Sequence, residues 1–254
     1  MFFRQFLNDE TACASYLFGC KTAGKFAVVD AHADLVDDYI AGAASQGSEI
    51  VAVIETHIQA DHVSGLPALV ERTGATAYLP ERSGAEFAHH ALADREVVEL
   101  GNTVVEAIAT PGHAPAHHSY LVTDHRRGEE PWFVLTGDSL LVGDVGRPDL
   151  HAASEESVEH LARTLYRSLN ERLLTLPDQL LVYPAHYAGS VCGRGLSGHP
   201  ASSIGFERRN NEVLAAGSED AFVDAVLKDI PPAPERQAEI VAANRSGDPS
   251  AALA

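Results

Sequence analysis

Residues 50–62 read Ile-Val-Ala-Val-Ile-Glu-Thr-His-Ile-Gln-Ala-Asp-His, an apolar run followed by a polar cluster. The run is short and rich in β-branched residues, which is typical of a buried strand. Three metal-capable side chains follow close behind it: His57, Asp61 and His62. The spacing leads us to expect a further ligand at position 59, where Gln59 stands instead. This stretch therefore predicts a metal site at the end of a strand, with one position altered.

The composition limits the class of protein. The chain has 254 residues, of which 45% are hydrophobic and 21% charged. This is the balance of a globular protein that can bury a core without disulfides, and we expect one domain over residues 1–254. The 18 Lys and Arg against 36 Asp and Glu give a net charge of −18. With no basic run anywhere, this charge argues against nucleic acid as a partner.

Nothing in the sequence predicts a membrane or secreted protein. No apolar run approaches the ~20 residues that span a bilayer, and the N-terminus lacks the basic start and long apolar stretch of a signal peptide. The chain has 3 cysteines, an odd number that predicts no disulfide framework and favours a reducing compartment. We therefore expect a cytoplasmic protein without a membrane partner.

Strands and helices are predicted to alternate. Strands are expected over 25–30, 49–54, 75–79, 95–100, 103–108, 119–122, 132–135 and 179–183, and helices over 33–46, 62–72, 154–174 and in pieces from about residue 202. Metal-type side chains recur where these strands end: His57, Asp61, His113, Asp138 and His186. Loops at strand ends can bring such groups together at one edge of a sheet, so we expect one site.

Four segments together resemble the metallo-β-lactamase superfamily. They are residues 56–62, 110–113 (Thr-Pro-Gly-His), 136–138 (Thr-Gly-Asp) and 184–186 (Pro-Ala-His). The resemblance implies an α/β (α+β) fold, the αββα sandwich of two mixed sheets flanked by helices, with the site at one edge.

Further segments are similar to the persulfide dioxygenase branch of that superfamily, the sulfur dioxygenases related to glyoxalase II. They are residues 55–57, 61–65, 137–150, 189–193 and 203–208. The resemblance implies oxidation of glutathione persulfide, or a similar thiol persulfide, with O2 to sulfite and free thiol at one non-haem Fe(II). By position, the iron ligands would be His57, His113 and Asp138, a facial triad of two histidines and one carboxylate.

Gln59 departs from the superfamily. Its hydrolases have a second His there, as part of a three-histidine zinc site, and an uncharged amide is a weak ligand beside imidazole. The substitution therefore favours the dioxygenase over a glyoxalase-II-like thioester hydrolase with two zinc ions, which stays the alternative. Retention of the whole triad argues against a non-catalytic sensor. Gln59 and the absence of an export signal argue against a lactamase.

Other residues near the motifs have two possible roles each. Asp61 and His62 are expected either to act in catalysis or to remain from a second metal site, and His186 either to bind metal or to support a ligand. The histidines outside the motifs are expected at the surface or satisfied in the core. They are His89, His90, His117, His118, His125, His151, His160 and His199, of which His117 lies close to a predicted ligand in sequence.

Substrate-binding residues are expected among the few cations near glycine-rich segments. Arg147 is expected to bind a substrate carboxylate or, alternatively, to pair with Asp144 or Asp149. The further candidates are Tyr187, Arg194 and Arg208.

The cysteines and the expected partners complete the predictions. Cys13 and Cys20 are predicted to be buried core cysteines, and Cys192 to be either an inert loop thiol or a redox-active one. We expect no rhodanese domain in this chain, so a separate sulfurtransferase is the expected source of the persulfide. The resemblance also leads us to expect a homodimer.

Overall fold

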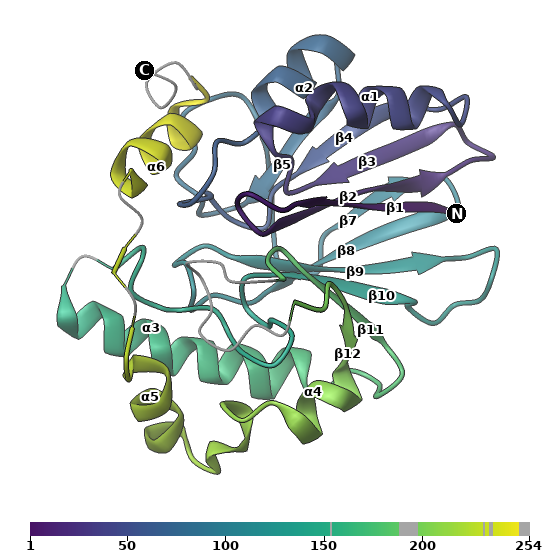
Figure 1. Cartoon of the computed structure of the whole chain (residues 1–254). Coiled ribbons are helices and arrows are strands. Elements are labelled where there is room, and N and C mark those ends of the chain that lie inside the picture. Colours follow the sequence, from purple (N-terminus) through teal and green to yellow (C-terminus); the bar gives the residue numbers. More distant parts are fainter. Residues whose placement is uncertain (153, 188–197, 231, 234–235, 249–254) are drawn as a thin grey trace.

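Two six-stranded sheets lie face to face, and helices cover their outer faces (Figure 1). The structure is a computed structural model that describes residues 1–152, 154–187, 198–230, 232–233 and 236–248. Each sheet contains both parallel and antiparallel pairs. The αββα sandwich implied by the sequence is thereby confirmed.

The first sheet is built from the N-terminal part of the chain. Its strands, in spatial order, are β1 (Phe2–Asn8), β2 (Cys13–Cys20), β3 (Lys25–Val29), β4 (Glu49–Ile54), β5 (Thr76–Pro80) and β6 (His90–Leu92). The pairs from β3 to β6 are parallel, and parallel neighbours need a crossover connection. The 3-10 turn η1 (Ala33–Leu35) with α1 (Val36–Ala44), and then α2 (Leu66–Thr73), make the first two crossovers.

The second sheet follows in the sequence. Its strands are β7 (Val97–Leu100), β8 (Thr103–Ala109), β9 (His118–Asp124), β10 (Phe133–Gly137), β11 (Leu181–Pro184) and β12 (Ser202–Ser203). Among the described strands of this sheet, only β10 and β11 pair parallel, across α3 (Glu155–Ser168) and the π-helical turn η2 (Leu169–Leu173). The described C-terminal helices are α4 (Ile204–Asn210), η3 (Leu214–Ala216), α5 (Glu219–Leu227) and α6 (Gln237–Ser246).

Both faces of the central strands are buried, each in its own apolar layer. In β10, Phe133 and Leu135 point into the layer between the sheets, whereas Val134 points outward to the layer that contains Leu165 and Leu169. A strand buried on both faces reads as a continuous apolar run. This explains why 132–135 was predicted as a strand without any alternation of polar residues.

The two sheets meet at the edge where β4, β8, β10 and β11 end. The backbone N–H of His118 donates to the carbonyl of Thr56 at 2.8 Å, which joins the two sheets there. Gly137 has φ 52°, and a Cβ on it would come within 2.5 Å of Nε2 of His117 and 2.7 Å of Oγ1 of Thr56. Glycine is therefore required for this close approach.

Some boundaries differ from the prediction. The helix expected over 62–72 begins at Leu66, because the backbone N–H of Gly65 donates to Ala31 and an isolated bridge joins Ser64 to His32. The helix expected over 154–174 becomes π-helical from Leu169. Strands β1 and β2 had not been predicted. Among the described residues, no helix has both the length and the apolar character needed to cross a membrane.

Candidate metal centre

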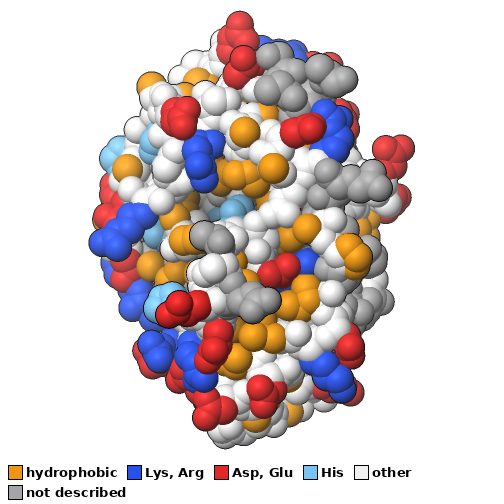
Figure 2. Space-filling view, turned by 90° about the vertical axis from the view of Figure 1, so that its left-hand side faces the viewer, with side chains coloured by type: hydrophobic (Ala, Val, Ile, Leu, Met, Phe, Trp, Pro, Cys, Tyr) orange, Lys and Arg blue, Asp and Glu red, His pale blue; other side chains and the backbone are white. Residues whose placement is uncertain are grey.

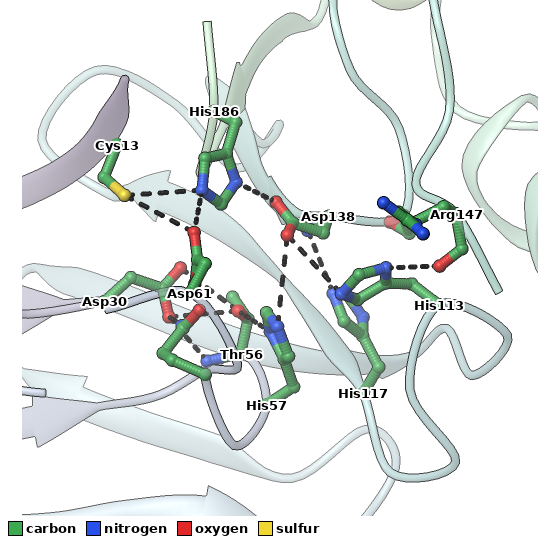
Figure 3. Close-up of polar contacts among 12 residues, drawn as sticks. Cys13, Asp30, Thr56, His57, Asp61, His113, His117, Asp138, Arg147 and His186 are labelled. Carbon is green, nitrogen blue, oxygen red and sulfur yellow. Dashed lines mark hydrogen bonds and ion pairs between the residues drawn. The ribbon is translucent and has the colours of Figure 1, made fainter. Parts of the chain in front are cut away.

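The three predicted ligands come together at this edge (Figure 3). Oδ2 of Asp138 lies 3.5 Å from Nε2 of His113 and 4.0 Å from Nε2 of His57. All three side chains are buried. Nε2 of His113 and Oδ2 of Asp138 have no hydrogen-bond partner among the described residues. Buried polar atoms without a partner are rare, so two of them facing one another fit a bound cation.

A backbone carbonyl fixes the tautomer of His113. Nδ1 of His113 lies 2.8 Å from the carbonyl oxygen of Arg147. A carbonyl only accepts, so Nδ1 must carry the proton and Nε2 keeps its lone pair. Metal-binding histidines usually donate their other ring N–H in this way, and His113 is therefore preorganised as a ligand through Nε2.

A hydroxyl and a carboxylate do the same for His57. Oγ1 of Thr56 lies 2.9 Å from Nδ1 of His57 and 3.0 Å from Oδ1 of Asp30. The ionised carboxylate only accepts, so the Thr56 hydroxyl donates to Asp30 and accepts the proton of Nδ1. The Nε2 lone pair of His57 then points toward Asp138.

His117, which lies near His113 in sequence, has a structural role. Its Nε2 accepts the backbone N–H of Asp138 at 3.2 Å, and its Nδ1 lies 2.9 Å from Oγ1 of Thr110. Both ring nitrogens are therefore used, and the ring joins Thr110 after β8 to the backbone of Asp138 after β10. The expectation of a satisfied buried histidine is confirmed at this position.

The charges of the cluster are those that metal binding requires. Burial alone would raise the pKa of Asp138, but His186 above all, and then His113 and His57, hold that pKa below its usual range. Burial and the neighbouring His113 hold the pKa of His57 well below its usual range. Ligands must be deprotonated to bind a metal, and the anionic Asp138 beside the neutral His57 meets this condition near neutral pH.

A second group of metal-capable side chains adjoins the first. Nδ1 of His186 lies 2.7 Å from Oδ1 of Asp138, and the Nε2 of the same ring contacts Oδ2 of Asp61 (Figure 3). Sγ of Cys13 lies 3.3 Å from Nε2 of His186, 3.6 Å from Oδ2 of Asp61 and 3.6 Å from Nδ1 of His62. Cys13, Asp61 and His186 each offer one ligand atom, and these atoms lie within 4.8 Å of one another.

Cys13 is buried, as predicted, but its surroundings are polar. Burial disfavours its thiolate, yet His186 and then His62 outweigh burial and lower the pKa of the thiol. Burial likewise opposes ionisation of Asp61, and His186 with His62 holds the pKa of Asp61 well below its usual range. The prediction of a buried core cysteine is therefore confirmed for its burial, but it did not include the polar neighbours Asp61, His62 and His186. Cys20 is buried and accepts a hydrogen bond from Asn102.

Gln59 contributes to a network of buried carboxylates. Its amide nitrogen donates to Oδ1 of Asp30 at 3.1 Å and to Oε2 of Glu55 at 3.3 Å. Burial, and then the neighbouring Asp30, raises the pKa of Glu55 to about 8. The side chain that replaces the usual histidine is therefore bonded to these two carboxylates and supports the strand ends.

His151 joins the first group, although it belongs to no motif. One ring nitrogen from each of His57, His113 and His151 lies within 4.8 Å of the other two. Its ring centroid is 5.9 Å from that of His57 and 5.8 Å from that of His113. Burial, and then His113, lowers the pKa of His151 to about 4. The expectation of an uninvolved histidine was wrong here, because the chain folds this loop back onto the site.

The predicted substrate residues lie elsewhere or are already paired. The Arg147 guanidinium is buried and makes a bidentate pair with Asp149, at 2.7 Å to each carboxylate oxygen. This is the second of the two alternatives for Arg147, a structural ion pair. Arg208 contacts Asp178 and nearby backbone carbonyls on the surface. The hydroxyl of Tyr187 donates to Oδ1 of Asp9 at 2.6 Å.

The remaining candidates lie outside the described residues. Arg194 and Cys192 both belong to the stretch 188–197, which the structure does not describe. Figure 2 shows histidine atoms in the middle of one face, bordered by hydrophobic side chains. Imidazole groups therefore reach the surface on this side of the molecule.

Comparisons with known proteins agree with the fold and the motifs. The family model of the metallo-beta-lactamase superfamily matches residues 8–186. Persulfide dioxygenase ETHE1 of Bos taurus is 27% identical over 242 residues, 95% of this chain and 86% of that protein. Bacterial hydroxyacylglutathione hydrolases are also among the relatives.

Two solved structures match nearly the whole chain. The crystal structure of ETHE1 from Myxococcus xanthus has a TM-score of 0.84 at 32% identity and covers 98% of this chain and 100% of that one. A metallo-beta-lactamase structure from Staphylococcus aureus has a TM-score of 0.91 at 32% identity, over 97% of this chain and 73% of that one. The protein therefore belongs to the metallo-beta-lactamase superfamily and is a homologue of the ETHE1 persulfide dioxygenases.

Proposed function

We propose that this enzyme oxidises a low-molecular-weight thiol persulfide, glutathione persulfide or a similar compound, with O2 to sulfite and free thiol. The cofactor is one non-haem Fe(II) per chain, bound by His57, His113 and Asp138. The observation that carries the proposal is the convergence of Nε2 of His113, Nε2 of His57 and Oδ2 of Asp138, three buried side chains from separate strand ends. Two imidazoles and one carboxylate form the ligand set of non-haem iron oxygenases.

The iron, when bound, would supply open coordination positions and the one-electron chemistry that O2 requires. The protein supplies geometry and charge. The carbonyl of Arg147 and the hydroxyl of Thr56 keep the Nε2 lone pairs of His113 and His57 directed toward Asp138. Asp138 adds the single negative charge of the ligand set.

The overall reaction releases protons, and an imidazole–carboxylate pair, His62 and Asp61, lies next to His186, which contacts the proposed ligand Asp138. One persulfide, one O2 and one water give one thiol, one sulfite and two protons; the terminal sulfur loses four electrons and O2 gains them. Nδ1 of His62 lies 3.2 Å from Oδ1 of Asp61. Imidazole and carboxylate are the groups most used for proton transfer. We assign this pair to proton transfer during the release of thiol and sulfite.

The experiment that tests this proposal measures substrates and product together. Anaerobically purified enzyme is given glutathione persulfide, and O2 consumption and sulfite are followed. We expect equal amounts of O2 consumed and sulfite formed, and loss of both in His113→Ala. His160→Ala, on the exposed face of α3, serves as the control. No O2 uptake with coenzyme A persulfide or glutathione persulfide would overturn the proposal.

A dinuclear thioester hydrolase is the second candidate. The observation that favours it is the second ligand group, Cys13, Asp61 and His186. A hydrolase would need a second metal there to generate a hydroxide nucleophile. Two zinc ions per chain and hydrolysis of S-lactoylglutathione, without O2 uptake, would establish this candidate instead.

A further inference from the structure

His151 is a half-buried residue beside the proposed metal ligands, and its inaccessible Nε2 atom is unused. Its Nε2 has no hydrogen-bond partner in the part of the chain that the structure describes. The same holds for Nε2 of His113 and Oδ2 of Asp138. A neutral imidazole nitrogen without a partner is costly to bury. Three such atoms in one small region point to a shared ligand.

The loop that carries His151 is fixed from both sides. Arg147 pairs with Asp149 through two hydrogen bonds of 2.7 Å, and its carbonyl accepts Nδ1–H of His113. The carbonyl of Leu150 accepts from the side chain of Gln237, the first residue of α6. The position of His151 next to the cluster therefore follows from contacts with the site and with the C-terminal helix.

Gln59 is engaged in contacts with other groups. The superfamily's hydrolases have a histidine at that position, but here the amide nitrogen of Gln59 donates to Asp30 and Glu55. Asn244 of α6 donates to the Gln59 carbonyl at 3.0 Å and fixes the backbone as well. The motif lacks an imidazole at position 59, and His151, about ninety residues later in the chain, brings an imidazole to the cluster instead.

We propose that His151 is a third imidazole ligand of the metal bound by His57, His113 and Asp138. The site would then have three histidines and one carboxylate, with His151 in place of the histidine that Gln59 replaces. This inference rests on the proposed metal site but is independent of the reaction catalysed there. It accounts for the unpartnered Nε2 of His151 and for the clustering of three imidazoles.

The first test is metal affinity, measured without persulfide. Metal-free protein is titrated with Co²⁺ in competition with a chelator, for the wild type, His151→Gln and the control His160→Gln. Loss of a hydrogen-bonded partner of a ligand costs about 10–100-fold in affinity. Loss of a ligand should exceed that range, so we expect a decrease of more than about 100-fold for His151→Gln and none for the control. Unfolding of the metal-free proteins checks that the variant is folded.

The second test counts imidazoles. X-ray absorption of the Fe(II)-loaded protein should give three imidazole rings in the wild type and two in His151→Gln. Added imidazole should restore the third ring in His151→Gly. Equal Co²⁺ affinity in the wild type and His151→Gln, together with two imidazole rings in both proteins, would overturn the inference.

The two proposals fail in different ways. Protein that binds metal through His151 but shows no persulfide-dependent O2 uptake retains this inference and loses the dioxygenase proposal. Protein that oxidises persulfide with the same metal affinity in His151→Gln loses this inference alone.

Discussion

Nδ1 of His186 lies 2.7 Å from Oδ1 of Asp138, so a single carboxylate joins the two groups of metal-capable side chains. Its other oxygen, Oδ2, faces His113 and His57. Because His186 contacts Asp61 through its second nitrogen, any change at His186 acts on both groups. In a one-iron enzyme this histidine orients a ligand, whereas in a two-metal enzyme it is a ligand.

Substitution of His186 distinguishes these two roles. If one metal is bound, His186→Ala still binds one iron per chain at saturation, with affinity lowered about 10–100-fold, as for loss of a supporting hydrogen bond. Cys13→Ala binds one iron per chain as well. Iron and zinc content after reconstitution provides the measurement. A fall from two metals in the wild type to one in either variant would show that the second group binds metal.

Gln59 is expected to stabilise the fold without binding metal. Gln59→Leu removes the donor to Asp30 and Glu55, and a buried acceptor left without its partner costs about 1–3 kcal/mol. We therefore expect a lower free energy of unfolding and unchanged iron content. Urea unfolding of the metal-free protein and metal analysis measure the two quantities. Loss of iron in a variant that remains fully folded would mean that Gln59 is a ligand.

The Thr56 hydroxyl is expected to strengthen metal binding through His57. Thr56→Val keeps the shape of the side chain but removes the acceptor for Nδ1–H of His57 and the link to Asp30. Such partners of a ligand contribute about 10–100-fold in affinity. Thr56→Ser keeps the hydroxyl and should behave as the wild type. Equal Co²⁺ affinity in Thr56→Val and the wild type would show that the Thr56 hydroxyl does not strengthen metal binding through His57.

His32 is expected to contribute to the pH dependence of stability. Its ring stacks on His62 at 4.9 Å between centroids, and burial, then the charge of His62, lowers its pKa from 6.5 to about 4. The unfolded chain therefore binds this proton more tightly, so the free energy of unfolding decreases as the pH falls from about 6.5 to about 4.

A phenylalanine at this position removes the titration but keeps the stacking. His32→Phe should show a shallower loss of stability than the wild type between pH 6.5 and pH 4, with metal removed from both. Chemical unfolding at several pH values within this window measures the difference. Parallel curves would mean that His32 carries the same charge in the folded and unfolded states.

The convergence of the three proposed ligands could be predicted from sequence because each belongs to a local motif. His57, His113 and Asp138 directly follow their strands within short motifs, so strand ends alone bring them to one edge. His151 has no such signal. It reaches the site because Arg147, Asp149 and Leu150 fold its loop back. The pair of Arg147 with Asp149 is local, but the contact of Leu150 with Gln237 joins residues 87 positions apart, which no local pattern contains.

Cys13 was misjudged for a similar reason. It bridges to His186, which is 173 residues away, and strand β2 itself was not predicted. Every residue of β2 is buried. Because Ser15 and Gly19 interrupt its apolar sequence, the strand does not show the continuous apolar run that would have predicted it. Asp30 follows β3 just as the proposed ligands follow their strands. This position at a strand end could have indicated from sequence that Asp30 belongs to the site, where it accepts a hydrogen bond from Thr56.

The central claim is a single iron that supports persulfide oxidation, and one titration tests it most directly. Metal-free enzyme is titrated anaerobically with Fe²⁺, and each sample is assayed for O2 uptake with glutathione persulfide. We predict that the rate rises linearly and levels off at one iron per chain. A rate that levels off at two metals per chain, or zinc-supported thioester hydrolysis with no O2 uptake at any iron content, would contradict it.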